Sequence, residues 1–314
     1  MVKNTFSYSI IIPHYNIPDL LARCLRTIPE RDDVQVIVVD DQSKDSENYL
    51  ETIPELHRKN VEFFIVDEKK YAGHARNVGL SHASGKWLLF ADPDDFYVDG
   101  FMNITDKYLN ENVDIIYFNT VSCDCYKTDC ILQSCTQPRF DKYEKSGDDL
   151  RFRLSFTEPW AKMVRRDFVM KHQLMFQETI AHNDLLFGVK IAVLAKRTKI
   201  VNTPIYWYVY RLGSTGHSVG NESYEKVCAR VSAWHETHKF LESAGFKLKS
   251  YLPLEPCIIL FRRDQLTYFK ILKYMRSNNM RYILTFLLTL KQAIFFMFGQ
   301  KRSGFEEKVI PPAK

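Results

Sequence analysis

The sequence Trp87-Leu88-Leu89-Phe90-Ala91-Asp92-Pro93-Asp94-Asp95 joins an apolar run directly to three carboxylates. The apolar run predicts a buried β-strand, so the carboxylates fall at the carboxyl end of that strand, where open α/β sheets bind ligands. Like charges this close repel one another unless a cation lies among them. The cluster therefore predicts a site for Mg²⁺ or Mn²⁺, which often share their ligand shell with substrate phosphates. The alternative is an acidic turn before a helix at about Asp99, because Pro and Asp are ordinary turn residues.

Strand and helix signals alternate through the first 120 residues. Apolar, β-branched runs predict strands at residues 8–12, 34–39, 61–66, 86–90 and 114–119. Helices are expected to begin at Pro18 and near residue 45, and to cover residues 72–83 and 99–109. Strands this apolar, separated by helices, indicate an α/β fold with a Rossmann-like, mostly parallel sheet and helices on both faces.

The rest of the chain predicts less regular structure and then a helical extension. Residues 123–156 predict a hairpin followed by a loop, and helical periodicity returns over 160–170 and 184–194. A late strand is expected at 204–210, and from about residue 222 the chain is expected to be mainly helical. We therefore expect an α/β domain over residues 1–220 and a mainly helical C-terminal region over 221–314.

Composition limits the classes of partner and the compartment. Of the 314 residues, 46% are hydrophobic and 26% are charged, which is an ordinary globular balance, and the net charge is +5. No run of Lys and Arg is dense enough to predict nucleic-acid binding, whereas anionic small molecules or an anionic membrane surface fit the mild positive charge. The chain has seven cysteines, an odd number, and no leading apolar segment with a cleavage site, so we expect a cytoplasmic protein.

Four cysteines lie close together, and they allow two interpretations. They are Cys123, Cys125, Cys130 and Cys135. One interpretation is a zinc site, but the spacing lacks the paired CxxC motifs that bring four thiolates around one tetrahedral ion. The other is a hairpin that turns near Lys127-Thr128-Asp129 with thiols on both faces. We favour the hairpin.

Residues 282–298 form the most apolar stretch of the sequence, and Lys291 and Gln292 interrupt it. The uninterrupted part is too short to span a bilayer. Basic residues punctuate the surrounding helical sequence, and they are Lys270, Lys273, Arg276, Arg281, Lys291, Lys301 and Arg302. This pattern predicts either a helix lying in the interface of an anionic membrane or a core helix that packs on the α/β domain.

Polar motifs follow the predicted strands in a fixed order. Pro13-His14-Tyr15-Asn16 ends the first strand, Asp40-Asp41 ends the second, residues 72–80 follow the third, and Ser84-Gly85-Lys86 leads into the fourth and its acidic cluster. All of these positions fall where a ligand at the carboxyl edge of the sheet would meet them. Taken together, they resemble the family 2 glycosyltransferases with the GT-A fold, and the resemblance covers roughly residues 7–215.

The resemblance implies a binding site for a nucleotide-sugar donor, most simply a UDP-sugar. In such a site Asp40 and Asp41 would contact the base or ribose, and Pro13 and Tyr15 would shape the pocket for the nucleoside. The alternative for the two aspartates is capping of the following helix. The full set of candidates for nucleotide contact is Pro13, Tyr15, Asn16, Asp40, Asp41, Gly73, Arg76, Asn77 and Asp92.

Two residues of this set have clear physical reasons to lie near phosphate. Gly73 permits close approach of the backbone to a ligand, and Arg76 offers a charged fork for phosphate. Arg76 is also suited to pair with Asp92 or Asp94 as a structural strut, and the sequence does not separate these roles. The resemblance further implies that Asp92 faces ribose or metal, that Asp94 is a metal ligand, and that Asp95 is a second possible ligand.

Transfer of a sugar to an alcohol also requires a base that removes the hydroxyl proton. The resemblance places Asp184 at the position of this base, which in the family is the Asp of an acidic pair that opens a helix. Asn183 replaces the usual first acid of the pair, and Glu178 or His182 is available to compensate. The alternative for Asp184 is a cap on the helix that follows.

Two segments resemble the acceptor and diphosphate regions of the family less specifically. Trp160 and Lys162 lie in a segment that resembles the acceptor side, where the Trp would stack on a sugar ring, although a Trp here also fits the core. Residues of a loop after the late strand would fold over the diphosphate, and they are Arg211, Ser214 and His217.

These signals predict an inverting, metal-dependent glycosyltransferase that acts in surface polysaccharide synthesis. Its donor would be a UDP-sugar, and its acceptor would be a hydroxyl of a glycan or a lipid-linked saccharide. The protein would lie in the cytoplasm or peripherally on the inner face of the cell membrane. One alternative is an inactive glycan-binding or membrane scaffold protein, which Asn183 favours. Another is a sugar-phosphate nucleotidyltransferase, but residues 13–16 lack the Gly-rich phosphate loop that this class needs.

Overall fold

The structure is a computed structural model, and it describes residues 6–124, 127–132, 134–210, 223–248, 264–280, 283, 285–287 and 309–310. The chain divides into two compact units. Residues 1–179 and 187–212 form the first, here called the α/β unit, and residues 180–186 and 213–314 form the second, here called the C-terminal unit. The short segment 180–186 therefore belongs to the same unit as residues 213–314.

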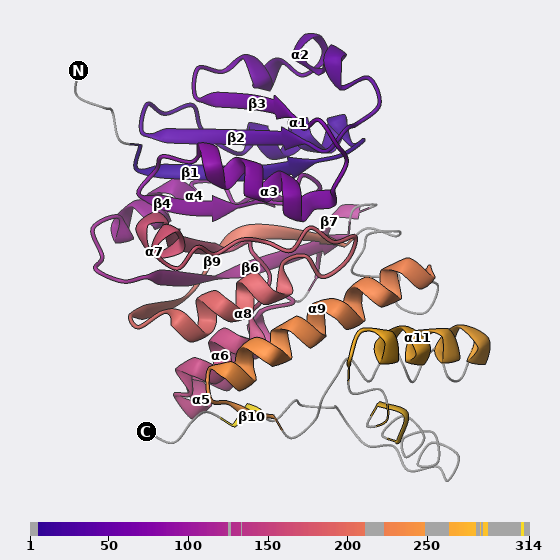
Figure 1. Cartoon of the computed structure of the whole chain (residues 1–314). Helices are drawn as coiled ribbons and strands as arrows, with labels where there is room; N and C mark the ends of the chain where they lie inside the picture. Colours follow the sequence, from indigo (N-terminus) through magenta and orange to yellow (C-terminus); the bar gives the residue numbers. More distant parts are fainter. Residues whose placement is uncertain are drawn as a thin grey trace. The chain divides into compact units, whose positions relative to one another are not determined.

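One nine-stranded sheet forms the centre of the α/β unit, with strand order β3-β2-β1-β4-β8-β6-β9-β5 and with β7 paired to β6 outside this path (Figure 1). Two parallel groups are β1 (Tyr8–His14), β2 (Val34–Asp40), β3 (Val61–Ile65) and β4 (Trp87–Phe90), and then β6 (Ile115–Asp124) with β9 (Thr198–Tyr210). The antiparallel strands are β5 (Phe96–Tyr97), β7 (Lys127–Leu132) and β8 (Lys162–Arg165). The predicted α/β fold is confirmed.

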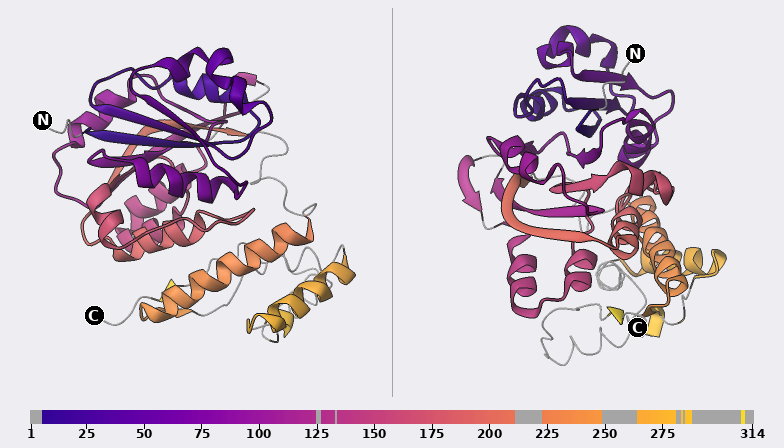
Figure 2. Two further views of the ribbon diagram at one scale, coloured as in Figure 1. Left: turned by 45° about the horizontal axis from the view of Figure 1, so that its top comes forward. Right: turned by 90° about the vertical axis from the view of Figure 1, so that its left-hand side faces the viewer.

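Helices lie on both faces of this sheet (Figure 2). They are α1 (Pro18–Arg26), α2 (Tyr49–Thr52), α3 (Tyr71–His82), α4 (Phe101–Thr105), α5 (Gln137–Ser146), α6 (Asp149–Ser155), α7 (Arg166–Lys171) and α8 (Leu185–Leu194). Short 3-10 turns cover Ser46–Asn48, Pro54–His57 and Asp106–Tyr108. Because helices cover both faces, every residue of β1, β2 and β4 is buried, as expected for parallel strands.

Glycine allows α3 to lie directly against the sheet. A Cβ added at Gly79 would lie 2.5 Å from the Ile11 Cγ2 atom, which is closer than carbon atoms can approach. Gly85, just before β4, is equally tight, because a Cβ there would lie 2.4 Å from the backbone carbon of Tyr8. These two glycines therefore fix the distance between α3, β1 and the strand that leads into the acidic cluster.

Three sequence predictions for local structure need correction. Residues 160–170, expected to be helical, contain β8 followed by α7, because Met163 and Val164 are both fully buried and a strand covered on two faces lacks an alternating pattern. The loop expected before residue 156 contains α5 and α6. The single helix expected over 99–109 is only α4, followed by a 3-10 turn.

The cysteine-rich segment contains the predicted hairpin, since β6 pairs antiparallel with β7 through Ser122 with Leu132 and Cys123 with Ile131. Cys123 and Cys135 are free thiols, and Cys125 lies outside the described residues, as does the side chain of Cys130. Among the residues that the structure describes, no cluster of three His, Cys, Asp or Glu side chains is arranged to hold a metal ion.

In the C-terminal unit the structure describes two long helices, α9 (Tyr224–Ser243) and α11 (Gln265–Ser277). Their side chains form a small core of their own from Val227, Val231, Tyr268, Ile271 and Met275. The two-residue strands β10 (Lys247–Leu248) and β11 (Val309–Ile310) pair antiparallel. Most of residues 282–298 lie outside the described residues. Across the described part of the chain, no helix has both the length and the apolar character needed to cross a bilayer.

Candidate active site

The ends of β1 and β2 are tied together by a buried pair, His14 and Asp40. His14 Nε2 accepts a hydrogen bond from the Ile17 N–H at 3.2 Å, so the ring proton is on Nδ1 and is donated to Asp40 at 2.7 Å. Asp40 also accepts a bond from the Ser43 N–H at 2.7 Å. Burial raises the pKa of Asp40, but the hydrogen bonds from His14 and Ser43 outweigh it and bring the pKa below its usual value. Asp40 is therefore a fixed, ionised anchor at this edge.

Asp41 holds the start of α3. Its two carboxylate oxygens accept hydrogen bonds from the backbone N–H groups of Lys70 at 2.9 Å and Tyr71 at 2.8 Å. Burial raises the pKa of Asp41, although the two N–H donors oppose the rise. The sequence left open that Asp41 caps the helix that directly follows it. In the structure, Asp41 instead accepts hydrogen bonds from the backbone N–H groups at the N-terminus of α3.

Tyr15 presents an exposed ring beside these anchors. Tyr15 is 40% exposed, and the Lys69 ammonium lies over its ring, 3.4 Å from the centroid, in a cation–π contact. Asn16, next in the chain, has a φ of +54° and accepts a hydrogen bond from the Lys44 N–H at 2.8 Å. An exposed aromatic face with a cation beside it suits a planar, anionic ligand such as a nucleotide.

Helix α3 connects this edge to the acidic turn, which we define as residues 92–95. Arg76 is buried and pairs with Asp92 at 2.5 Å, so the strut predicted as one of its two roles is present. Asn77 exchanges two hydrogen bonds with the backbone of Phe176, at 3.0 and 2.8 Å. Glu178 in turn pairs with His74 at 3.0 Å. One helix thus orients both the acidic turn and the segment that leads toward Asp184.

The acidic turn is held from several elements at once. The Asp92 N–H donates to the Tyr206 hydroxyl at 2.8 Å, and the Val209 N–H donates to the Asp95 carboxylate at 2.8 Å, both from β9. Arg23 of α1 donates to the backbone carbonyl of Asp94. The turn also closes on itself through the Asp95 N–H and the Asp92 carbonyl at 3.1 Å.

Burial and mutual repulsion both act on the carboxyl groups of the acidic turn. Burial, followed by the charges of Asp94 and Asp92, raises the pKa of Asp95 well above its usual value. Burial also raises the pKa of Asp92, with Arg76 opposing and Asp94 adding to the rise. Asp92 pairs with Arg76, and Asp95 bonds to β9, so both of these carboxylates have protein partners. This fits Mg²⁺ or Mn²⁺ held by one or two carboxylates and completed by substrate phosphates.

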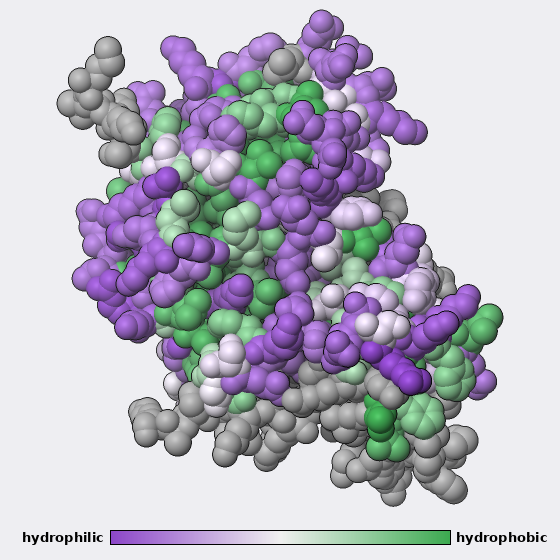
Figure 3. Space-filling view, in the orientation of Figure 1, coloured by the Kyte–Doolittle hydropathy of each residue, from purple (hydrophilic) through white to green (hydrophobic). Residues whose placement is uncertain are grey.

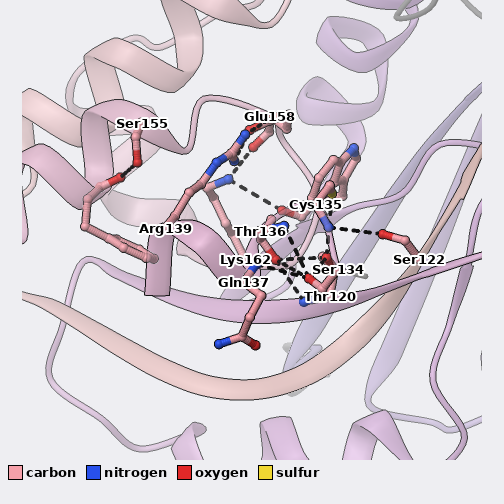
Figure 4. Close-up of polar contacts among 12 residues, drawn as sticks. Thr120, Ser122, Ser134, Cys135, Thr136, Gln137, Arg139, Ser155, Glu158 and Lys162 are labelled. Atoms are coloured by element: carbon pink, nitrogen blue, oxygen red, sulfur yellow. Dashed lines mark hydrogen bonds and ion pairs between the residues drawn. The ribbon is translucent and has the colours of Figure 1, made fainter. Parts of the chain in front are cut away.

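The segment that resembles an acceptor site is packed against the chain itself. Arg139 and Glu158 form a bidentate pair at 2.7 Å, and Lys162 donates to the Glu158 carbonyl (Figure 4). Lys162 is only 1% exposed, and its ammonium lies 3.5 Å from the centroid of the Phe156 ring. Trp160 is 4% exposed and stacks on Tyr206 with centroids 5.6 Å apart. These contacts place Trp160 in the core, the alternative considered from the sequence, and leave Lys162 no room to reach an acceptor.

The candidate base lies in the C-terminal unit, directly before α8. Asp184 and Asn183 form the turn that precedes Leu185, as the sequence predicted. His182 has a φ of +54°, and its Nε2 atom lies 2.5 Å from a guanidinium nitrogen of Arg230 on α9. Burial and the charge of Arg230 lower the pKa of His182 to about 4, so the ring is neutral near pH 7 and accepts this hydrogen bond. Arg211, Ser214 and His217 lie outside the described residues.

Comparison with known proteins gives the family of the chain. Residues 9–173, more than half of the chain, match the family model for glycosyl transferase family 2. The chain belongs to glycosyl transferase family 2. This family 2 chain is 26% identical over 245 residues to the uncharacterized glycosyltransferase YibD of Escherichia coli, an alignment that covers 71% of this chain and 67% of that protein.

Two solved structures show the same fold. Staphylococcus aureus TarS 1–349 in complex with UDP-GlcNAc has a TM-score of 0.64 and 16% identity, and the match covers 98% of this chain and 100% of that one. The mannosyltransferase PcManGT of Pyrobaculum calidifontis, in complex with GDP-Man and Mn²⁺, has a TM-score of 0.51 and 17% identity. The match covers 92% of this chain and 80% of that one. The family 2 chain therefore has the GT-A fold expected from its sequence motifs.

Proposed function

We propose that this family 2 glycosyltransferase uses a UDP-sugar donor and inverts the anomeric carbon as it transfers the sugar to a hydroxyl. The observation that carries the proposal is the acidic turn, held by Arg76, Tyr206 and Val209 at the same edge of the sheet as the exposed Tyr15 ring. Complexes of the structural neighbour TarS with UDP-GlcNAc and with UDP support the choice of donor.

The residues predicted for nucleotide contact have different roles in this donor site. Tyr15 offers to the nucleobase the ring face that Lys69 does not cover, and Lys69 supplies positive charge for the diphosphate. Asp40 and Asp41 keep the adjoining loops in place, because their carboxylates already bond to His14 and to the start of α3. Pro13, Asn16, Gly73 and Asn77 complete the edge, and Arg76 fixes Asp92 for the ribose or the metal.

A divalent cation is part of this proposal. Asp94, with Asp92 and Asp95 beside it, would hold Mg²⁺ or Mn²⁺, which when bound neutralises the charge of the departing diphosphate. The protein itself fixes the geometry of the turn, because Arg23, Arg76, Tyr206 and Val209 all bond to it. The Mn²⁺ in the PcManGT complex supports a divalent ion in this fold.

The acceptor step is proposed for Asp184. A carboxylate there would remove the proton of the acceptor hydroxyl as its oxygen attacks the anomeric carbon from the face opposite the diphosphate. The C–O bond to the acceptor forms while the bond to the diphosphate breaks, so one displacement inverts the configuration. Arg230 and His182 anchor the loop that carries Asp184, so Asn183 need not supply the support of the usual first acid.

An assay of UDP release across several UDP-sugars tests the function directly. We expect release that depends on Mn²⁺ or Mg²⁺, that EDTA abolishes, and that is fastest with one donor sugar. An inactive glycan-binding protein would release no UDP with any donor. A nucleotidyltransferase would release pyrophosphate from a nucleoside triphosphate and a sugar phosphate, and that result would replace the proposal.

The C-terminal unit supports an acceptor at an anionic membrane. Leu266 and Phe269 on α11 are 69% and 52% exposed, and exposed Lys270, Lys273 and Arg276 lie on the same helix. Figure 3 shows apolar and strongly polar surface side by side over α11. Exposed apolar side chains beside basic residues suit a helix that lies on anionic lipid. We therefore propose a lipid-linked saccharide acceptor for surface polysaccharide, reached from the inner face of the cell membrane.

Replacing Leu266 and Phe269, the two large apolar side chains exposed on α11, tests the membrane contact. We expect Leu266→Ser with Phe269→Ser to reduce cosedimentation with vesicles containing phosphatidylglycerol by about tenfold, because each lost apolar side chain weakens insertion. Met170→Ser on α7 is the matched control, since Met170 is 50% exposed in the other unit. The contact would be contradicted if wild-type protein did not cosediment with anionic vesicles. It would also be contradicted if the double variant and the control bound the vesicles equally well.

A further inference from the structure

The Tyr206 hydroxyl lies between the two ends of the acidic turn. Tyr206 is fully buried in β9, and its oxygen accepts the Asp92 N–H at 2.8 Å. A phenol that accepts in this way still has its own proton to donate, and burial, followed by the charge of the nearby Asp95 carboxylate, raises the pKa of Tyr206. Asp94 lies between Asp92 and Asp95 in the sequence. One hydroxyl therefore bonds to the residue that opens the turn and lies near the carboxylate that closes it.

A second contact from the same strand fixes the far end of the turn. Three residues beyond Tyr206, the Val209 N–H donates to Asp95 Oδ1 at 2.8 Å. Asp95 is 2% exposed, so its carboxylate depends on the Val209 donor of β9 in place of water. The turn and β9 are 114 positions apart in the sequence, so a strand far along the chain holds the residues on both sides of Asp94.

The ring of Tyr206 has little freedom to move. It stacks on Trp160 at an interplanar angle of 9°, and it meets Tyr97 edge to face with centroids 5.4 Å apart. Trp160 is held in turn, because buried Lys162 donates to the Trp160 carbonyl at 3.5 Å and also to the Glu158 carbonyl. Arg139 pairs with Glu158 (Figure 4). The polar cluster around Glu158 thus supports the aromatic layer on which the Tyr206 hydroxyl depends.

We infer that Tyr206 is a positioning residue that presents Asp94 to the divalent cation and to the donor diphosphate. The inference rests on the proposed function, and it makes Asp95 an anchor bound to β9. Groups one layer behind a metal ligand set its orientation, and removing them typically weakens metal affinity or activity by about 10–100-fold. Loss of the Tyr206 hydroxyl should therefore weaken metal binding at Asp94, although Tyr206 itself contacts neither metal nor donor.

Tyr206→Phe tests the inference, with Tyr97→Phe as the matched control. Tyr97 is also buried in the same aromatic layer, but its hydroxyl bonds to the Phe90 carbonyl at 3.4 Å, whereas the Tyr206 hydroxyl bonds to the Asp92 amide. We expect Tyr206→Phe to weaken Mn²⁺-dependent binding of UDP by about 10–100-fold, measured by calorimetry. The affinity of Tyr97→Phe for UDP with Mn²⁺ should stay within about twofold of wild type, because this substitution changes only the aromatic layer.

Hydrogen exchange supplies a readout that needs no ligand. The amide of Asp92 should exchange faster in Tyr206→Phe than in wild type or Tyr97→Phe, because it loses its only bond to β9 that the structure describes. Equal exchange and equal UDP binding in the two variants would overturn the inference. Failure of Tyr206→Phe to fold would also overturn it, since the hydroxyl would then serve the fold in general.

The donor site and the role of Tyr206 can fail separately. Wild-type protein that binds no UDP, with or without Mn²⁺, would remove the proposed donor site. Wild-type protein that binds UDP with Mn²⁺, together with a Tyr206→Phe variant of the same affinity, would leave the donor site in place and remove Tyr206 from it.

Discussion

Asp184→Asn should reduce sugar transfer by about 10²–10⁴-fold, which is the range that a general base contributes. Asn is nearly isosteric with Asp but cannot take a proton from the acceptor hydroxyl. The measurement is initial-rate UDP release with saturating donor and acceptor, in the presence of Mn²⁺. Binding of UDP, followed by calorimetry, should change by less than about twofold, because the base acts on the acceptor and not on the nucleotide.

The same substitution separates the two interpretations of Asp184. Asn caps helix N-termini as well as Asp does, so a residue that only caps α8 would tolerate it with little loss of stability or activity. The control is Asp148→Asn at the start of α6, where Asp148 accepts a hydrogen bond from the Arg151 N–H at 3.0 Å. Transfer at the wild-type rate by Asp184→Asn would remove this residue from the mechanism.

Asp94→Asn should abolish the dependence of donor binding on a divalent cation. A neutral amide is a poor ligand for Mg²⁺ or Mn²⁺ compared with a carboxylate, and a metal at a departing phosphate contributes several kcal/mol to the transition state. We expect turnover to fall by roughly 100-fold or more, since about 1.4 kcal/mol corresponds to a factor of ten. Calorimetric titration of UDP with and without Mn²⁺ measures the loss of metal dependence.

Asp99→Asn is the matched control for this prediction. Asp99 carries the same charge, follows the acidic turn closely and is exposed, so its substitution tests the general effect of removing one negative charge nearby. It should leave metal-dependent binding unchanged. If Asp94→Asn still shows UDP binding that Mn²⁺ strengthens as in wild type, Asp94 is not a ligand and the proposed donor site loses its metal.

Much of the fold was predictable because the deciding signals are local. The first four strands are short apolar runs, and each is followed by a turn of polar residues, so their order and their carboxyl ends could be read directly. The missed strand β8 has two covered faces and only four residues, and such a run has no periodicity that distinguishes it from a helix. Helices α5 and α6 were missed because their sequence is polar and irregular.

The candidate site was predictable in its residues but not in their contacts. The motifs located Asp40, Asp41, Arg76 and the acidic turn, yet the partner that caps α3 and the strand that holds Asp95 depend on tertiary structure. Tyr206 was expected in a strand, and alternation along that strand says only which face a side chain occupies. No pattern in the sequence indicates that its hydroxyl reaches the Asp92 amide 114 positions away.

The hydrogen bond between Arg230 and His182 limits how this enzyme can be recombined with its relatives. Consider a hybrid that takes its sheet and the loop before α8 from this protein and its final helices from another family member. Its α9 would then come from a different protein than the loop that carries His182. Unless the incoming helix brings a cation that matches position 182, the loop would lose its anchor even though every strand were intact. A hybrid that keeps both Arg230 and His182 should therefore keep this anchor.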